Sequence, residues 1–164
     1  MTVKTISTTA FNDQKPGTSG LRKKTRSFMV PHYLENYVAA TFTAIGGGSG
    51  KSFVLGGDGR FFNREAIQTI LKMAAAQGAA RVIVGQGGLL STPAASHLIR
   101  LNGADGGFIL SASHNPGGID ADFGLKFNAA NGGPASEALT ARIYDATLAI
   151  ESYDVADVED VNLD

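Results

Sequence analysis

The residues best suited to carry chemistry lie at 111–118, SASHNPGG, directly after the apolar run at 107–110. In open α/β sheets, ligands gather at the carboxyl ends of strands, where this segment would lie. Ser113 is therefore a candidate nucleophile or phosphoryl carrier, and His114 beside it can exchange a proton near neutral pH. Further along the chain, Lys126 adds a positive charge. Together these types suit the transfer of an anionic group.

The rest of the segment favours a loop that admits an anion. Asn115 and Pro116 are typical of a turn. Gly117 and Gly118 leave their backbone N–H groups free to face an anion, because no side chain stands in the way. A capping or turn serine is the more frequent role for Ser113 taken alone. The combination of these residues favours a phosphoryl site over a purely structural loop.

A cluster of basic residues near the amino terminus supplies more positive charge. The net charge is −1, which disfavours bulk nucleic-acid binding, but residues 151–164 hold six acidic and no basic side chains. The remaining residues hold 14 basic and 9 acidic side chains, a balance of +5. The cluster suits a small anionic ligand, with a solvated basic loop as the alternative. Its members are Lys15, Arg22, Lys23, Lys24 and Arg26.

Length and composition fit one globular domain. The 164 residues can bury a core, and the absence of cysteine excludes a disulfide framework. No apolar run approaches the roughly 18 residues of a spanning helix. The first residues lack the apolar centre of a signal peptide, so we expect a cytoplasmic protein without membrane partners.

A glycine-rich loop at 46–52, GGGSGKS, imitates a nucleotide-binding loop. The Walker pattern requires glycine five positions before its Gly-Lys-Ser, and Ile45 stands there instead. The predicted order is also reversed, with a helix before the loop and a strand after it. We therefore expect a flexible connector with an exposed Lys51.

Apolar periodicity predicts alternating strands and helices, which is typical of an α/β layer fold with a largely parallel sheet. A helix begins at Pro31, Asn63 caps a second, and Ser91 or Thr92 caps a third. The expected helices are 31–45, 64–77, one after residue 92, and 135–150. The expected strands are 52–56, 81–85, 107–110 and a short piece at 125–127, and the first 20 residues add a strand or hairpin.

Five segments in order resemble a known family. SASHNPGG is similar to the Thr/Ser-Ala-Ser-His-Asn-Pro-Gly-Gly phosphoserine signature of the α-D-phosphohexomutase superfamily. The other segments resemble the first domain of its phosphoglucomutase branch, over about residues 5–150. They are KPGTSGLRKKT (15–25), GGDGRFFN (56–63), LSTPAAS (90–96) and GIDADFGLKFN (118–128).

The resemblance implies a fold and a reaction. Residues 1–150 would form a three-layer domain with a mixed, largely parallel sheet between helices. Residues 151–164 would be an acidic linker or the start of a second domain. The reaction would be the reversible interconversion of glucose 1-phosphate and glucose 6-phosphate, through a phosphoserine and glucose 1,6-bisphosphate.

The resemblance also implies roles for the residues of the central loop. Ser113 would be the phosphoserine and would bind Mg²⁺ through its phosphate. His114 would assist proton movement, and Lys126 would neutralise charge or act as a base. These roles agree with the chemistry of phosphoryl transfer, which depends on positioning and charge stabilisation.

Four further residues would contact the sugar phosphate. They are Thr18, Ser19, Arg22 and Asn115. Arg22 carries a planar guanidinium, whose fork matches phosphate oxygens.

The sequence departs from the family in one respect. Such enzymes have four domains, and this chain matches only the first, without the Asp-x-Asp-x-Asp metal loop. Residues 57–60, GDGR, hold one carboxylate and do not replace that loop. We therefore expect activity only with the remaining domains. The alternatives are a non-catalytic phosphoprotein or interaction domain, and phosphomannomutase-type specificity.

Overall fold

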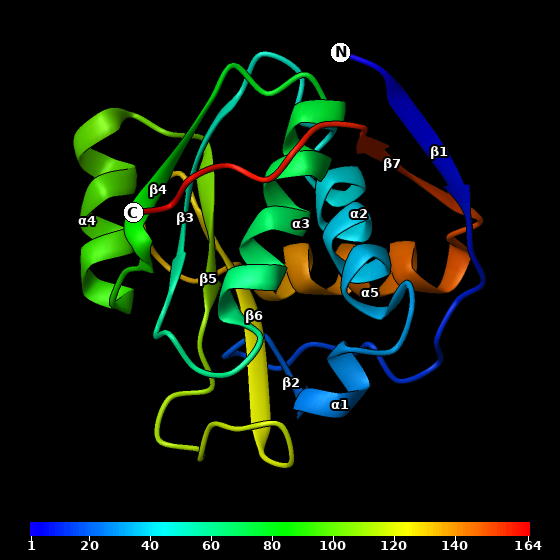
Figure 1. The fold of residues 1–164 in the computed structure, drawn as a ribbon, viewed down its shortest axis with the longest axis horizontal. Helices are drawn as coiled ribbons and strands as arrows, with labels where there is room; N and C mark the ends of the chain where they lie inside the picture. Colours follow the sequence, from blue (N-terminus) through cyan, green and yellow to red (C-terminus); the bar gives the residue numbers. More distant parts are fainter.

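The chain forms two sheets and five helices, and the computed structural model describes all residues from 1 to 164 (Figure 1). The strands are β1 (Val3–Ser7), β2 (Leu21–Lys24), β3 (Ser52–Gly57), β4 (Arg81–Leu89), β5 (Gly106–Leu110), β6 (Asp122–Ala129) and β7 (Ser152–Ala156). The helices are α1 (Thr25–Phe28), α2 (Tyr33–Ala44), α3 (Asn63–Ala76), α4 (Thr92–Asn102) and α5 (Glu137–Ala149).

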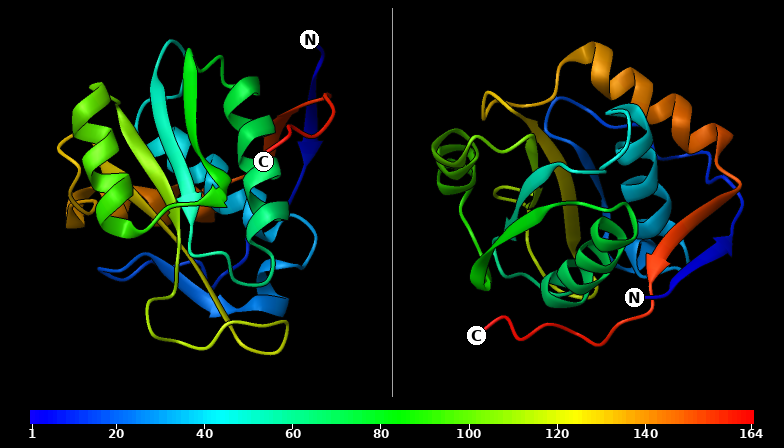
Figure 2. Two further views of the ribbon diagram at one scale, coloured as in Figure 1. Left: turned by 60° about the vertical axis from the view of Figure 1, so that its left-hand side comes forward. Right: turned by 90° about the horizontal axis from the view of Figure 1, so that it is seen from above.

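The main sheet lies between two layers of helices, as expected (Figures 1 and 2). Alternate residues of its central strands point to opposite faces. Val54 and Ile109 pack with Ile99 of α4 on one face. Phe53 and Phe108 belong to the larger core on the other face, which also contains buried side chains of α2, α3 and α5. The central strands are apolar on both faces because helices cover both.

The five strands of this sheet follow the order β2-β6-β5-β3-β4. The pairs β3–β4 and β3–β5 are parallel, whereas β5–β6 and β2–β6 are antiparallel. The predicted mixed sheet is confirmed, with antiparallel pairing throughout one side. β6 follows β5 through the loop 111–121 without a crossover helix, and neighbouring strands joined in this way must run in opposite directions.

Helix starts show one confirmed and two wrong predictions. Ser91 caps α4, because its side chain accepts a hydrogen bond from the Ala94 amide at 3.2 Å. Asn63 does not cap α3: it is the first helical residue, and its side-chain Nδ2 instead donates to the Gly88 carbonyl oxygen at 3.1 Å. The helix predicted to begin at Pro31 begins at Tyr33, after a left-handed His32. Both misplaced starts follow a residue with positive φ, since Phe62 also has φ 79°.

The glycine-rich loop joins α2 to β3 in the predicted order, but Lys51 is partly buried rather than exposed. Its ammonium group donates to the Ile45 carbonyl oxygen at 2.7 Å. Ile45 is the residue that caps the carboxyl end of α2, and a cation there satisfies an unpaired carbonyl group of the helix terminus. Lys51 therefore has a structural role.

The two ends of the chain meet in a separate ribbon. β1 pairs antiparallel with β7, as the two views of Figure 2 show. The predicted early strand thus pairs across the whole chain. Acidic residues beyond β7 form ion pairs with α3, including Asp160 with Lys72 at 2.6 Å. None of the helices has the length and apolar character needed to cross a membrane.

Candidate active site

The loop 111–121 extends beyond the end of the main sheet, next to β2 and α1 (Figure 1). It carries Ser113, which is exposed and has a left-handed backbone with φ 52°. This conformation is unfavourable for a residue with a side chain, so surrounding contacts must hold it. One contact is local, since the Ser113 amide donates to the Ser111 hydroxyl at 3.1 Å.

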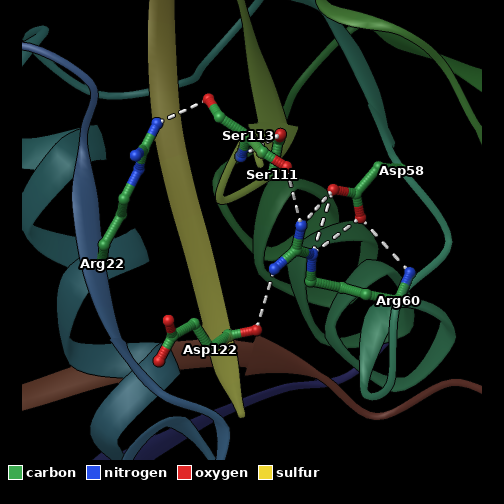
Figure 3. A network of polar contacts seen from close by, with 6 residues as sticks. All are labelled: Arg22, Asp58, Arg60, Ser111, Ser113 and Asp122. Atoms are coloured by element: carbon green, nitrogen blue, oxygen red, sulfur yellow. Dashed lines mark hydrogen bonds and ion pairs between the residues drawn. The ribbon is translucent and has the colours of Figure 1, made fainter. Parts of the chain in front are cut away.

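Arg22 reaches Ser113 from β2. Its guanidinium Nη2 donates to the Ser113 hydroxyl oxygen at 2.7 Å (Figure 3). Arg22 lies opposite Gly124 in the β2–β6 register. The Ser111 carbonyl oxygen packs against the α-carbon of Gly124 so closely that any β-carbon would collide with it. A strand position without a side chain therefore lets the serine loop approach β6 and brings Ser113 to Arg22.

Lys126 follows two residues after Gly124 on β6, and therefore points to the same face of the sheet. That face is the α4 side, because Lys126 pairs with Ile109, which packs on α4. Partial burial lowers the pKa of Lys126, and the nearby positive charge of Arg22 lowers it further. Lys126 thus lies near Arg22, which bonds the serine hydroxyl, and two neighbouring cations of this kind favour an anion.

A second arginine, Arg60, bonds the backbone of the serine loop. Asp58 follows β3, and its carboxylate forms an ion pair with Arg60 at 2.8 Å (Figure 3). The Arg60 side chain is only 8% exposed. Its guanidinium donates to the carbonyl oxygens of Ser113 at 3.3 Å and Asp122 at 3.0 Å. Arg60 therefore contacts both ends of the loop.

The side chains of the other predicted site residues are exposed. His114 and Asn115 are exposed on the loop, and neither side chain makes a hydrogen bond within the chain. Thr18 and Ser19 are exposed in the turn before β2. The turn lies against β6, because a β-carbon on Gly20 would come within 2.5 Å of Lys126. The structure thus brings Ser113 to Arg22 directly and leaves these four side chains open to a ligand.

The residues of this chain do not form a magnesium site by themselves. No three His, Asp or Glu side chains lie together in a metal-binding arrangement. The carboxylates at this edge are already paired: Asp58 with Arg60, Asp120 with Arg26 and Asp122 with Lys24. A phosphate on Ser113 would offer oxygen ligands, and Mg²⁺ usually takes only one or two protein carboxylates beside phosphate oxygens.

Sequence reasoning missed Arg60. As a metal loop GDGR has too few carboxylates, and the family resemblance of residues 56–63 assigns no role to Arg60. β3 and β5 are parallel neighbours, so the residues that follow them meet at one edge of the sheet. An acidic and a basic residue directly after β3 were therefore the available signal for a contact with the serine loop.

Comparisons with known proteins identify the family and agree with the fold. The phosphoglucomutase/phosphomannomutase α/β/α domain I family matches residues 13–154. A phosphoglucomutase from Rhizobium radiobacter is 56% identical over 162 residues, which cover 99% of this chain and 30% of that protein. The cytoplasmic phosphoglucomutase of Solanum tuberosum is 54% identical, with 94% of this chain and 28% of that protein covered.

A solved structure has the same architecture. It is the open form of pp63/parafusin (phosphoglucomutase), an exocytosis-sensitive phosphoprotein from Paramecium, with a TM-score of 0.92 and 45% identity. The match covers 96% of this chain and 29% of that one. The chain thus spans about 30% of the length of the curated relatives that it matches. It belongs to the phosphoglucomutase/phosphomannomutase family and corresponds to that family's α/β/α domain I.

Proposed function

We propose that this chain is the phosphoryl-carrying domain of a phosphoglucomutase and that Ser113 holds the phosphoryl group. The observation that carries the proposal is the 2.7 Å hydrogen bond from Arg22 to the Ser113 hydroxyl oxygen, in an exposed loop at the carboxyl end of β5. A serine held in this way presents its oxygen to solvent while a fixed cation stands beside it. Such a fixed charge stabilises the negative oxygens of a phosphoryl group in transfer.

The reaction needs two balanced steps. In the first, a hydroxyl of the glucose phosphate attacks the phosphorus on Ser113, the bond from phosphorus to the serine oxygen breaks, and glucose 1,6-bisphosphate forms. The sugar hydroxyl loses its proton, and the serine oxygen regains one. The second step returns the other phosphoryl group of the bisphosphate to Ser113. Over both steps, glucose 1-phosphate and glucose 6-phosphate exchange with no net loss of phosphate.

Three residues of the chain would serve these steps. Arg22 donates to the serine oxygen and would stabilise the charge that develops there when phosphate leaves. Lys126 has a lowered pKa, so a larger fraction of it is neutral and able to accept a proton than for an ordinary lysine. His114 is exposed beside the serine and would assist the proton transfer.

The remaining site residues would hold the substrate. Asn115 is exposed on the serine loop, Thr18 and Ser19 are exposed in the turn that lies against β6, and all three would contact the sugar phosphate. Mg²⁺, when bound, supplies further neutralisation of phosphate charge. The chain offers it one ligand, the phosphate on Ser113, so its other ligands would come from the remaining domains. A cytoplasmic location is proposed from the relatives that are described as cytoplasmic.

The test joins residues 1–164 to the remaining domains of the Rhizobium radiobacter relative and incubates the fusion with glucose 1,6-bisphosphate. We expect intact mass to show one added phosphoryl group, which peptide fragmentation places on Ser113. Ser113→Ala should abolish both the added mass and the conversion of glucose 1-phosphate to glucose 6-phosphate. Full turnover by Ser113→Ala would refute the proposal.

A second function has one observation in its favour. The Paramecium relative is described both as a phosphoglucomutase and as an exocytosis-sensitive phosphoprotein. A phosphoprotein or interaction domain would require phosphate on Ser113 but no turnover. The same fusion separates the two functions, because a carrier with no catalytic role would take up phosphate without converting substrate. Replacing glucose 1-phosphate by mannose 1-phosphate tests phosphomannomutase-type specificity.

A further inference from the structure

Arg60 joins three parts of the molecule that meet at the edge of the sheet. Its guanidinium bonds the Asp58 carboxylate after β3, the Ser113 carbonyl oxygen at the start of the loop, and the Asp122 carbonyl oxygen where β6 begins. None of these contacts uses the Ser113 hydroxyl. Arg60 therefore acts on the backbone of the loop and leaves the reacting oxygen free.

The loop is shaped around this side chain. A β-carbon on Gly117 would approach the β-carbon of Arg60 within 2.9 Å, so the loop packs directly on the arginine stem. The backbone bonds from Asn115 to Ala112 and from Asp122 to Pro116, both 3.0 Å, close the loop above it. The GDGR and NPGG segments thus form one packed unit.

The chemistry of this contact requires arginine. The guanidinium presents donors in a rigid planar fork, and in Arg60 the fork serves one carboxylate and two carbonyl oxygens at once. A lysine ammonium is a point charge without this fork. Asp58 is 31% exposed, and its ion pair holds the guanidinium in the required plane.

We propose that Arg60, oriented by Asp58, is a positioning residue that holds Ser113 in its left-handed conformation, with the hydroxyl directed to Arg22. The unfavourable φ of 52° at Ser113 has to be maintained by contacts, and the bond from Arg60 to the Ser113 carbonyl oxygen supplies one. Misplacement of a reacting group by about 1 Å can reduce a rate by about 100-fold. The contribution of Arg60 would therefore appear in the phosphoryl-transfer step rather than in substrate binding.

The catalytic test rests on the proposed function and uses the fusion described above. Arg60→Lys should lower kcat by about 10- to 100-fold while KM changes by less than about twofold. Added guanidinium ion should restore part of the activity of Arg60→Ala. Arg64→Ala is the matched control, because Arg64 pairs with Asp164 on the surface and we expect its kcat to be unchanged. Wild-type kcat in Arg60→Lys would overturn the proposal.

Hydrogen exchange on the 164-residue chain gives a readout that does not depend on turnover. In Arg60→Lys and in Asp58→Asn, the amides of Asn115 and Asp122 should exchange faster, while amides of β5 keep wild-type rates. Equal exchange in the wild type and both variants would overturn the positioning role of Arg60, even if Ser113 accepts phosphate. If the loop exchanges faster in the variants but the wild-type fusion takes up no phosphate on Ser113, the positioning role of Arg60 stands and the proposed function is refuted.

A double-mutant cycle tests the packing of the two motifs. Gly117→Ala should accelerate exchange in the loop when Arg60 is present, because the new β-carbon meets the arginine stem. The same substitution should have a much smaller effect in an Arg60→Gly background, which removes the β-carbon that the new methyl group would meet. Additive effects of the two substitutions would show that the motifs are independent and would contradict the proposal.

Discussion

At the scale of single residues, the site depends on placing two cations close together. Arg22 of β2 bonds the serine hydroxyl. Lys126 of β6 points to the same face of the sheet as Arg22, and its pKa is lowered by burial and by the charge of Arg22. Repulsion between the two side chains disfavours the charged form of Lys126 when no anion is present. A phosphate placed between them removes that penalty, so the unfavourable charge arrangement in the free protein favours an anionic ligand.

Replacing Arg22 with glutamine should raise the pKa of Lys126 toward its ordinary value of 10.5, because the second cause of the shift is removed. Partial burial would keep it from rising fully. The measurement is an NMR titration of the Lys126 side chain in both proteins. Lys51→Met is the control, since Lys51 contacts the end of α2 instead of the site. An unchanged Lys126 pKa in Arg22→Gln would show that burial alone causes the shift.

The same shift predicts a pH dependence of stability. Between the lowered pKa of folded Lys126 and 10.5, the unfolded chain holds a proton that the folded chain has released. The free energy of unfolding contributed by this group therefore rises with pH across that window. Lys126→Met should flatten the rise, as measured by urea unfolding at a series of pH values. Identical slopes in the two proteins would contradict the prediction.

At the scale of elements, Gly124 controls how the loop crosses β6. Gly124→Ala places a methyl group against the Ser111 carbonyl oxygen, which belongs to the backbone and cannot rotate away. We expect a loss of about 1–3 kcal/mol in the free energy of unfolding and a large loss of phosphate uptake by Ser113. Gly103→Ala is the control: its left-handed helix-capping position makes it destabilising, but it lies away from the loop. Uptake reduced equally in both variants would indicate a general loss of folding.

Helix starts show which local signals sequence reasoning can use. Ser91 followed by Pro93 predicted the start of α4, because capping depends on residues within one turn. Asn63 is an equally good capping type, but its side chain bonds the Gly88 carbonyl oxygen, 25 residues away. That contact exists only after α3 packs beside β4, so no local pattern encodes it. Predictions from sequence therefore hold where the partner is local and fail where it is supplied by packing.

This difference can be measured. Ser91→Ala should lower the free energy of unfolding by about 1 kcal/mol, the usual effect of losing an exposed cap. Asn63→Ala should cost more, about 1–3 kcal/mol, because it leaves a buried carbonyl group without its partner. Urea unfolding of both variants compares them directly. A larger loss for Ser91→Ala would mean that the Asn63 contact contributes little.

At the scale of the whole molecule, the α/β class and the serine loop follow from the sequence, whereas the sheet order and the Arg60 contact do not. Apolar runs and glycine clusters mark strands and loops, since those signals are local. The antiparallel return of β6 and the pairing of β1 with β7 depend on which segments meet in space. The Arg60 contact with the loop belongs to the second group, because its two carbonyl partners, Ser113 and Asp122, are 53 and 62 residues away.

The arrangement of the sheet also predicts how the isolated chain behaves. Arg22 and Lys126 face the α4 side of the sheet, but α4 packs mainly on β3 and β5, and the Ser113 hydroxyl that Arg22 bonds lies on an exposed loop. A substrate there would be held from one side only, and phosphoryl transfer gains most from closure that excludes water. We expect the 164-residue chain to fold with a single cooperative urea transition yet to show no measurable turnover of glucose 1-phosphate. Fusion to the remaining domains should restore turnover, and activity of the chain alone at the level of the fusion would show that this face needs no covering domain.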